Sequence, residues 1–574
     1  MVLLLIMRFY FLLIGFFISI ISLNAQSNKL FIPDTISGSR IKLQLKTGSH
    51  EFIPGKLSKT MGVNQDYLAP SIILRRGQKV DFLVENSIGD TTTIHWHGLH
   101  VAPKVDGGPH TYILNNSTWK PTFEVLDNPG TYWYHPHLHH KTNKHVQLGI
   151  SGFILVNDTN EEKLPLPRTY GNDDIPLLIQ TKGFDSDGEI EIETALDTTL
   201  LCNGTRKAYV EVGSHVVRFR LLNGASERVF NIGLSNSLSF YLIGTDGGLL
   251  DSSLLLNRLQ LAPGERAEIL VDLLEQKDKT IYLKNFGSEL PNGIYGARQP
   301  GMGAGQTIPN YALNPLNGGD YNLLEIRVIQ SSLSTSIVKI PQKLIAVQRL
   351  DRNVIDTNRT LVFMPMNMGP TAIQGPFMID NAMFDMSKIN HRVKLNNTEI
   401  WTLRNQTPIA HPFHIHHGNF EILDINGSVP PPYLSGKKDV VLVPAGNGVV
   451  RFVMKFETFY DDTIPYMYHC HMLTHEDHGM MGQFIIESPS NLYSNQLKNF
   501  NVINLYPNPV LSGVIHLKSS DNRELGLIEL FDLSGKIIKK FNYGSIIGEL
   551  DVSELTAGIY IVKQGQQTYK IIIE

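Results

Sequence analysis

The sequence predicts an all-β protein built from several β-sandwich domains, and three observations lead to that fold class. The chain has 574 residues, too many for one hydrophobic core at roughly 100 to 200 residues per domain. Short apolar-alternating runs bounded by Gly, Pro, Asn and Asp recur throughout, whereas long helical periodicities are scarce. Three blocks (77–86, 213–223 and 391–405) each carry a strand-like run ending in Asn, a weak repeat that indicates repeated domains.

The first 25 residues are predicted to be a secretory signal peptide. An apolar run interrupted by Arg8 leads into small and polar residues ending in LNAQ, which predicts cleavage after Ala25. Translation from Met7 would place Arg8 in the positively charged start of the signal. A retained membrane anchor is the alternative, and the closely following small-residue cleavage site argues against it. No later stretch reaches the roughly 18 to 20 apolar residues that a transmembrane helix needs.

Polar segments at 156–174, 329–342 and 487–499 divide the rest of the chain. They predict domains over residues 27–160, 165–330 and 340–490, followed by a small domain over 500–574. Each predicted domain contains strand-like runs, among them SIILRRGQKVDFLVEN in the first, VVRFRLLNGA in the second and VVRFVMKFE in the third. Short alternating runs of this kind are typical of β-sandwiches.

Composition and cysteine usage narrow the function classes. The net charge is -4 and 18% of residues are charged, so no basic surplus exists for nucleic-acid binding. The two cysteines, Cys202 and Cys470, could form a disulfide in an oxidising compartment. Cys470 has histidine neighbours that make a metal a better partner, and Cys202 is expected to be a small buried hydrophobe.

Four histidine motifs stand out: IHWHG, YHPH, HPFHIHHG and HCHMLTHEDHGMM. Successive side chains of a strand point to opposite faces, so both imidazoles of a His-x-His pair project to one side. Four such pairs could converge on one cluster of eight imidazoles, formed by His95, His97, His135, His137, His414, His416, His469 and His471.

The same parity separates a second site. Cys470 lies between His469 and His471 and must face away from them, and His411 is an odd number of residues before His414. His475 and Met480 follow in the turn and strand beyond, where they can curl back onto Cys470. Two imidazoles, a thiolate and a thioether are the ligands of a blue copper centre. One His-x-His pair alone is more often a surface or core feature, but four pairs with this cysteine motif predict metal binding.

At these motifs the chain resembles the multicopper oxidases. HWHG, HPH, HPFHIH and HCHMLTHEDHGMM stand in the family order, and VDGGP, TDGGLL and LAPGERAEILVD resemble segments of the family's first two domains. The likeness spans roughly residues 40 to 490 and is nearest to the bacterial three-domain laccase-like, cuprous-oxidase-like and bilirubin-oxidase-like branch. It implies three cupredoxin-like Greek-key β-sandwich domains, the third carrying the type 1 copper.

The resemblance also implies a copper ion for each group of ligands, four in all. His95 and His414 would hold the type 2 copper. One type 3 copper would be held by His97, His135 and His471, and the other by His137, His416 and His469. The type 1 copper would be held by His411, Cys470, His475 and Met480.

The implied reaction couples four one-electron oxidations of a reductant to the reduction of dioxygen to water. Asp106 and Glu476 match the acidic positions that the family uses near the cluster, and proton delivery needs carboxylates placed there. A turn-forming Asp106 and a solvated Glu476 are the alternatives. Trp96 and Trp133 are expected to pack around the cluster. The expected partners are dioxygen and a small reductant, with the protein a monomer.

The substrate is predicted from the segments near the third-domain motif. FMPMNMG (363–369) and MIDNAMFDM (378–386) supply methionines, but few, and Thr407 and Ile409 precede His411 where cuprous oxidases carry an acidic residue and a methionine. Methionines there are more often core filler than ligands. The leading hypothesis is therefore a laccase-like oxidase of phenolic reductants, with a cuprous, ferrous or manganous oxidase and a non-catalytic secreted copper-binding protein as alternatives.

The last 75 or so residues resemble the C-terminal sorting domain of the type IX secretion pathway of Bacteroidota. The likeness rests on YPNPV at 506–510, the LSGK strand pair and the ending LTAGIYIVK. It implies export through the periplasm and across the outer membrane, followed by removal of the tail or attachment of the protein to the cell surface. An ordinary fourth β domain is the alternative.

Overall fold

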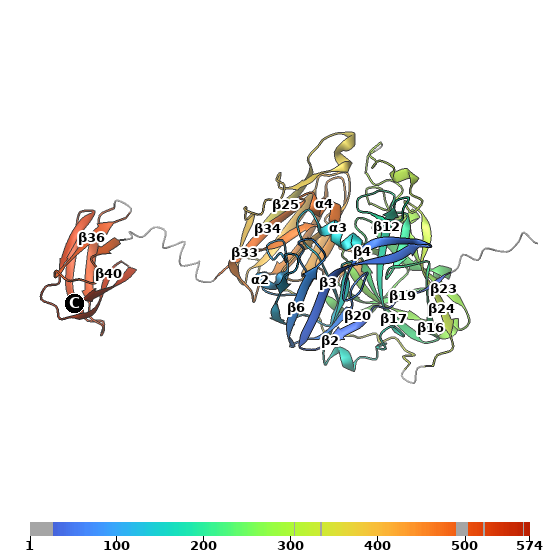
Figure 1. The fold of residues 1–574 in the computed structure, drawn as a ribbon, viewed down its shortest axis with the longest axis horizontal. Helices are drawn as coiled ribbons and strands as arrows, with labels where there is room; N and C mark the ends of the chain where they lie inside the picture. The colour runs from blue at the N-terminus through green and yellow to red at the C-terminus, as the bar shows by residue number, and fades with distance from the viewer. Residues whose placement is uncertain (1–26, 304, 333–335, 489–502, 521–522, 566) are drawn as a thin grey trace, which may run out of the picture. The chain divides into compact units, whose positions relative to one another are not determined.

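The computed structural model describes residues 27–303, 305–332, 336–488, 503–520, 523–565 and 567–574. The chain divides into two compact units, Met1–Glu487 and Ser488–Glu574, and strands dominate both (Figure 1). The described α-helices are short: α2 (Pro103–Asp106), α3 (Thr142–Leu148) and α4 (Leu473–Asp477). The all-β prediction is therefore confirmed. The predicted signal peptide lies outside the described residues, and no helix within them is long and apolar enough to cross a membrane.

The first pair of sheets contains two of the histidine motifs. One sheet has the order β2 (Thr35–Ser37), β5 (Ser71–Arg75), β11 (Gly152–Asn157), β10 (Gly130–His135), β7 (His95–His97). The other consists of β4 (Lys56–Val63), β3 (Arg40–Ile53), β6 (Lys79–Ser87), β8 (Thr118–Trp119) and, paired with β6, β9 (Thr122–Glu124). The first half of β3 alternates exposed and buried residues, and its buried Leu43 joins Ile154 of the facing sheet in one apolar core.

The second pair of sheets has the largest apolar core, to which Phe219 and Ile326 contribute from opposite sheets. One sheet runs β1 (Asn28–Lys29), β16 (Ala208–Gly213), β24 (Asp320–Ile329), β23 (Thr280–Phe286), β18 (Phe230–Leu234), β21 (Leu259–Leu261). The other runs β15 (Thr205–Arg206), β14 (Thr199–Cys202), β12 (Asp174–Phe184), β17 (Val216–Asn223), β22 (Arg266–Asp272), β19 (Phe240–Thr245), β20 (Gly248–Leu256), with β13 (Ile190–Glu191) beside β12. The two-residue β1 pairs parallel with β16 of this second pair of sheets. Residues 28 and 29 fall within the predicted first domain, because so short a strand has no sequence periodicity that could indicate its partner.

The third pair of sheets contains the other two histidine motifs. One sheet has the order β26 (Phe377–Ile379), β25 (Thr357–Pro365), β28 (Thr398–Asn405), β32 (Gly448–Lys455), β30 (Phe420–Ile425). The other has the order β27 (His391–Lys394), β34 (Met481–Glu487), β33 (Asp461–Cys470), β29 (His411–Ile415), β31 (Val440–Val443). Trp401, Phe452 and Phe484 fill the core between them.

The C-terminal unit is a small two-sheet structure with its own core, built around Leu517, Ile528 and Val562. One sheet consists of β35 (Ile503–Tyr506), β36 (Val514–Ser519) and β39 (Ile547–Asp551). The other has the order β38 (Ile537–Tyr543), β37 (Gly526–Phe531), β40 (Gly558–Gln564), β41 (Gln567–Ile573).

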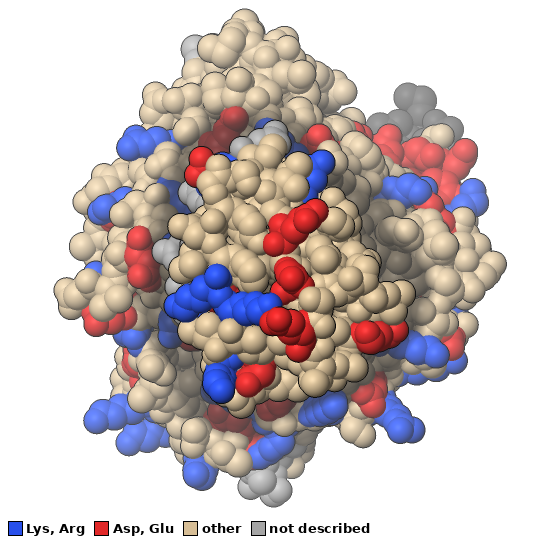
Figure 2. Space-filling view, turned by 90° about the vertical axis from the view of Figure 1, so that its left-hand side faces the viewer, with Lys and Arg blue, Asp and Glu red and all other residues tan. Residues whose placement is uncertain are grey.

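On the face of the molecule in Figure 2, lysines and arginines are interspersed with aspartates and glutamates, in line with a net charge near zero.

Candidate metal centres

Each of the four His-x-His pairs begins on a strand of one of two sheets. In the first pair of sheets, His95 on β7 lies opposite His135 on β10. In the third, His414 on β29 lies opposite His469 on β33. Opposite residues of antiparallel strands point to the same face, so each sheet presents its imidazoles together. All eight side chains are buried, and the structure brings them into one cluster.

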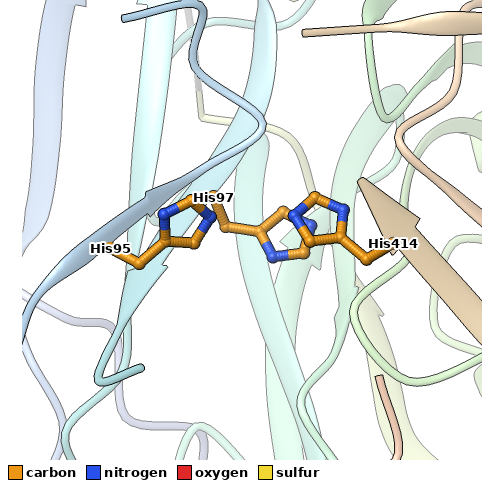
Figure 3. Close-up of side chains that lie close together, drawn as sticks. All are labelled: His95, His97 and His414. Atoms are coloured by element: carbon orange, nitrogen blue, oxygen red, sulfur yellow. The ribbon is translucent and has the colours of Figure 1, made fainter. Parts of the chain in front are cut away.

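The eight imidazoles fall into three groups of three, with His97 shared by two of them. Within each group, one ring nitrogen of every histidine lies within 4.8 Å of those of the other two. The groups are His95, His97 and His414; His97, His135 and His471; and His137, His416 and His469. The ring of His97 stacks on that of His414 at 3.8 Å, and His95 stacks on His416 at 3.9 Å. Figure 3 shows His95 and His97, from one strand, facing His414 from the opposite side.

The donor atoms of this cluster fit metal ions. His95 Nε2, His414 Nε2 and His471 Nδ1 are buried ring nitrogens without a hydrogen-bond partner, an arrangement that costs free energy unless something coordinates them. Burial lowers the pKa of His414 well below its usual value and that of His471 to about 3. His414 and His471 are therefore neutral, and neutral imidazole is the form that binds a metal.

The first, second and third pairs of sheets are called the first, second and third regions below. A second group lies on the other face of β33, where Cys470 is directed into the apolar core of the third region. Cys470 Sγ lies 3.4 Å from His411 Nδ1 and 3.6 Å from His475 Nδ1, and the two Nδ1 atoms are 3.3 Å apart. Burial raises the pKa of the Cys470 thiol well above its usual value, so a cation must displace its proton before the sulfur can act as a thiolate ligand.

His475 belongs to this second group, and the backbone of Met480 lies next to Cys470. His475 is the only member with a partly exposed side chain, and the ring of Phe377 packs against it at 4.6 Å. Met480 is buried in the same core as Cys470, and its backbone oxygen accepts a hydrogen bond from Cys470 N at 3.1 Å. The partly exposed His475 ring therefore forms the edge of the group nearest to solvent.

The two predicted acids lie against imidazoles of the cluster and not in solvent. Asp106 Oδ2 is 2.7 Å from His416 Nδ1, and its backbone oxygen is 2.9 Å from His95 Nδ1. Glu476 Oε2 is 3.1 Å from His469 Nδ1 and Oε1 is 3.3 Å from His137 Nδ1. Carboxylates in this position orient metal-binding imidazoles. The alternative of a solvated Glu476 is wrong, because both oxygens are buried.

A third acid, Asp439, also lies against imidazoles of the cluster and was not predicted from the sequence. Its Oδ1 lies 3.1 Å from His97 Nε2, and its backbone oxygen is 2.8 Å from His414 Nδ1. Arg266 of the second region donates to both of its carboxylate oxygens. The only signal in the sequence is a charged residue directly before the apolar run VVLV, which also fits an ordinary strand end.

The remaining candidates have structural partners. Both cysteines are free, and Cys202 is buried, with its thiol donating to Leu323 O at 3.2 Å. Trp133 stacks on His135 at 4.0 Å, and Trp96 packs beside Phe82 at 4.4 Å. The assignment of individual copper ligands stays a prediction.

Comparison with family models agrees with this geometry. Two models described as multicopper oxidase match residues 44–161 and 355–490. A third, described as a secretion system C-terminal sorting domain, matches residues 504–574. The matches cover the two histidine-bearing regions and the C-terminal unit.

Individual relatives extend the likeness over most of the chain. The multicopper oxidase mco of Staphylococcus haemolyticus is 32% identical over 77% of this chain and 87% of its own. The cell division protein FtsP of Dickeya dadantii is 28% identical over 80% of this chain and 93% of its own.

Two solved structures share the fold. The laccase-like multi-copper oxidase CueO of Ochrobactrum sp. is 31% identical, with a TM-score of 0.69 over 80% of this chain and 100% of that one. The Campylobacter jejuni multicopper oxidase, described as a metallo-oxidase, is 25% identical, with a TM-score of 0.67 over 81% of this chain and 96% of that one.

Proposed function

Because the chain belongs to the multicopper oxidase family, which implies copper binding and oxidase chemistry, we propose that it is a secreted laccase-like enzyme. It takes single electrons from a phenolic or similar organic reductant and couples four of them to the reduction of dioxygen to water. The single observation that carries the proposal is the position of Cys470, which lies in the chain between two imidazoles of the eight-membered cluster and itself belongs to the separate group with His411 and His475.

The four predicted copper ions would supply electron storage and dioxygen reduction. His411, Cys470, His475 and Met480 would hold one ion, and the eight imidazoles would hold three. Cys470 is joined through the backbone to His469 and His471, so only a few covalent bonds separate the two groups. A protein that only stores copper has no need for this connection.

Proton supply falls to the buried carboxylates. Dioxygen reduction to water consumes four protons, and the site is closed to bulk solvent because all eight imidazoles are buried. Asp106 Oδ1 is buried without a partner while Oδ2 holds His416. One oxygen of Asp106 therefore remains available to carry a proton toward the cluster.

Electron entry is assigned to the partly exposed ring of His475. Its neighbour Phe377 contacts both His475 and His411 but is only 1% exposed, so it supports the two imidazoles from within the core. The reductant needs only to reach this edge, since Cys470 lies directly behind it.

Copper loading tests the proposal. The loaded protein is expected to be blue, and Cys470→Ser is expected to lose the blue absorption while the eight imidazoles keep their copper. Oxygen uptake should then be compared across a phenol, bilirubin, Cu(I), Fe(II) and Mn(II). A colourless wild-type protein with full copper content would overturn the assignment, and uniformly negligible rates would favour a copper-binding protein.

Oxidation of metal ions is the second candidate, and one observation favours it. Phe384 N donates to Gly479 O at 3.0 Å, which places the methionine-bearing segment 378–386 beside the His475–Met480 turn. Met383 and Met386 on this segment are exposed, and thioethers bind Cu(I). If these sulfurs bind substrate, the double variant Met383→Leu, Met386→Leu should lower the rate of oxygen uptake with Cu(I) but not with the other reductants. If they do not, every rate should match that of the wild-type protein.

The C-terminal unit indicates secretion or cell-surface export. We further propose that this export uses the type IX pathway through the periplasm and leaves the enzyme as a monomer. Deletion of residues 503–574 should retain the protein inside the cell without changing the oxygen uptake of the purified first unit, which has its own cores.

A further inference from the structure

The second region supplies no imidazole to the cluster, yet one of its turns reaches it. Gly264, in the turn before β22, has a φ of +83°, which favours glycine. A Cβ added there would lie 2.8 Å from the ring of His471. The backbone of this turn therefore packs directly against a predicted copper ligand, and no other residue fits without displacing that ring.

Two residues later, Arg266, the first residue of β22, reaches Asp439 beside the cluster. Its side chain is 0% exposed, and Nη1 and Nη2 donate to the two carboxylate oxygens of Asp439 at 2.7 and 2.5 Å. Further donation to the backbone oxygens of Gly264 and Asp246 uses its other hydrogens. The guanidinium is thus fixed on several sides, and its planar fork matches the carboxylate.

Asp439 passes this orientation on to two imidazoles. Its Oδ1 contacts His97 Nε2 at 3.1 Å, and its backbone oxygen contacts His414 Nδ1 at 2.8 Å. His97 and His414 are stacked and, with His95, form one group of three. A displaced Asp439 would therefore release two of the three imidazoles in that group.

A second ion-pair set fixes the same segment of the third region. Lys438 Nζ lies 2.9 Å from Asp246 Oδ2 and 2.7 Å from Glu265 Oε1. Asp246 also accepts a hydrogen bond from Arg266 N. Three buried carboxylates thus face two buried cations in this segment.

We infer that Arg266 is a positioning residue for the group formed by His95, His97 and His414. It acts through Asp439, and it makes the second region a necessary part of a copper site to which that region gives no ligand. The inference rests on the proposed function, in which this group holds the type 2 copper.

The test compares Arg266→Lys with a matched control, Arg228→Lys. Arg228 is also buried in the second region and also binds one carboxylate, Asp197, through two nitrogens, but it contacts no predicted ligand. Each copper-loaded protein is dialysed against a graded chelator. Type 2 copper is measured by electron paramagnetic resonance, and type 1 copper is measured by its blue absorption.

Arg266→Lys should lose type 2 copper at a chelator concentration about 10- to 100-fold lower than wild type, while its blue absorption matches wild type. Arg228→Lys should lose type 2 copper where wild type does. Asp439→Asn should show the same selective loss, and combining it with Arg266→Lys should add little, because both changes act on one contact. The Asp439→Asn protein decides the matter if Arg266→Lys does not fold.

Equal retention of type 2 copper in wild type, Arg266→Lys and Asp439→Asn would overturn the positioning role and leave the proposed function standing. A wild-type protein without any type 2 signal would instead contradict the proposed function itself. Parallel losses in Arg266→Lys and Arg228→Lys would mean a general effect of buried arginine on stability, which also overturns the inference.

Discussion

The second region and the two regions beside it bury polar side chains in opposite ways. In the second, Arg220 donates to both oxygens of Asp174, and Glu268 accepts from Arg220 and Arg218. In the first and third, His95 and His414 bury ring nitrogens that no protein group satisfies. A hydrogen-bonded polar network contributes to folding, whereas several buried ring nitrogens that converge without hydrogen-bond partners indicate a bound ligand. The contrast separates scaffold from site on similar β frameworks.

The largest effect should come from removing a predicted copper ligand of the cluster. His135→Ala deletes one member of the cluster, and we expect oxygen uptake to fall by at least about 100-fold with the blue absorption retained. His411→Ala should instead lose the blue absorption while the cluster keeps its copper, and oxygen uptake should fall because electrons no longer enter. Copper content, blue absorption and oxygen uptake measured on both variants check this separation. Loss of both kinds of copper in either variant would break the two-site description.

Asp106→Asn should have the next largest effect. The amide keeps the size of the side chain, but it cannot carry a proton to the cluster, and general acid catalysis typically contributes 10²- to 10⁴-fold. We expect oxygen uptake to fall by about 100-fold with normal copper content, measured at saturating reductant. Asp90→Asn, at a carboxylate that pairs with Lys141 away from the cluster, is the control. Normal uptake in Asp106→Asn would assign Asp106 to orientation of His416 alone.

A satisfied pair should instead affect stability. Arg220→Met leaves the buried Asp174 without its main partner, and breaking a buried pair in this way costs about 3 to 5 kcal/mol. The partly exposed pair of Arg258 and Glu289 provides the control, since Arg258→Met should cost less than about 1 kcal/mol. Thermal unfolding measures both. An unchanged unfolding temperature in Arg220→Met, or a changed type 2 signal in the folded protein, would contradict the scaffold role of the Arg220–Asp174 pair.

Much of the site could be predicted from sequence because strand parity is a local property. The alternation of side chains along HCHM alone directs His469 and His471 to one face and Cys470 to the other, and the structure brings His411 and His475 to Cys470 as that parity requires. The all-β class followed from equally local patterns. Both predictions depend on residues within a few positions of one another.

Asp439 and Arg266 could not be predicted in the same way. Their contacts join residues 173 positions apart, and neither VVLV nor the turn before β22 indicates which face of another domain it meets. The pairing of β1 with β16 is similarly non-local. Long-range pairs of this kind depend on how the domains dock, which short-range alternation does not encode.

Lys182 differs from the other buried polar residues of the second region compared above. It is a buried amine without an ion pair among the described residues. Its Nζ donates to Gln147 O and Oε1 at 2.6 and 2.8 Å, and burial lowers its pKa to about 7. An unfolded lysine titrates at about 10.4, so the unfolded chain binds more protons between these values and stability rises with pH there. Lys182→Met lacks this term. Its stability relative to wild type should therefore fall from pH 7.5 to 9.5, by at most about 1.4 kcal/mol per pH unit, whereas the exposed Lys277→Met should show no such trend. Thermal unfolding at both pH values measures this, and a pH-independent difference for Lys182→Met would show that Gln147 keeps the buried amine protonated.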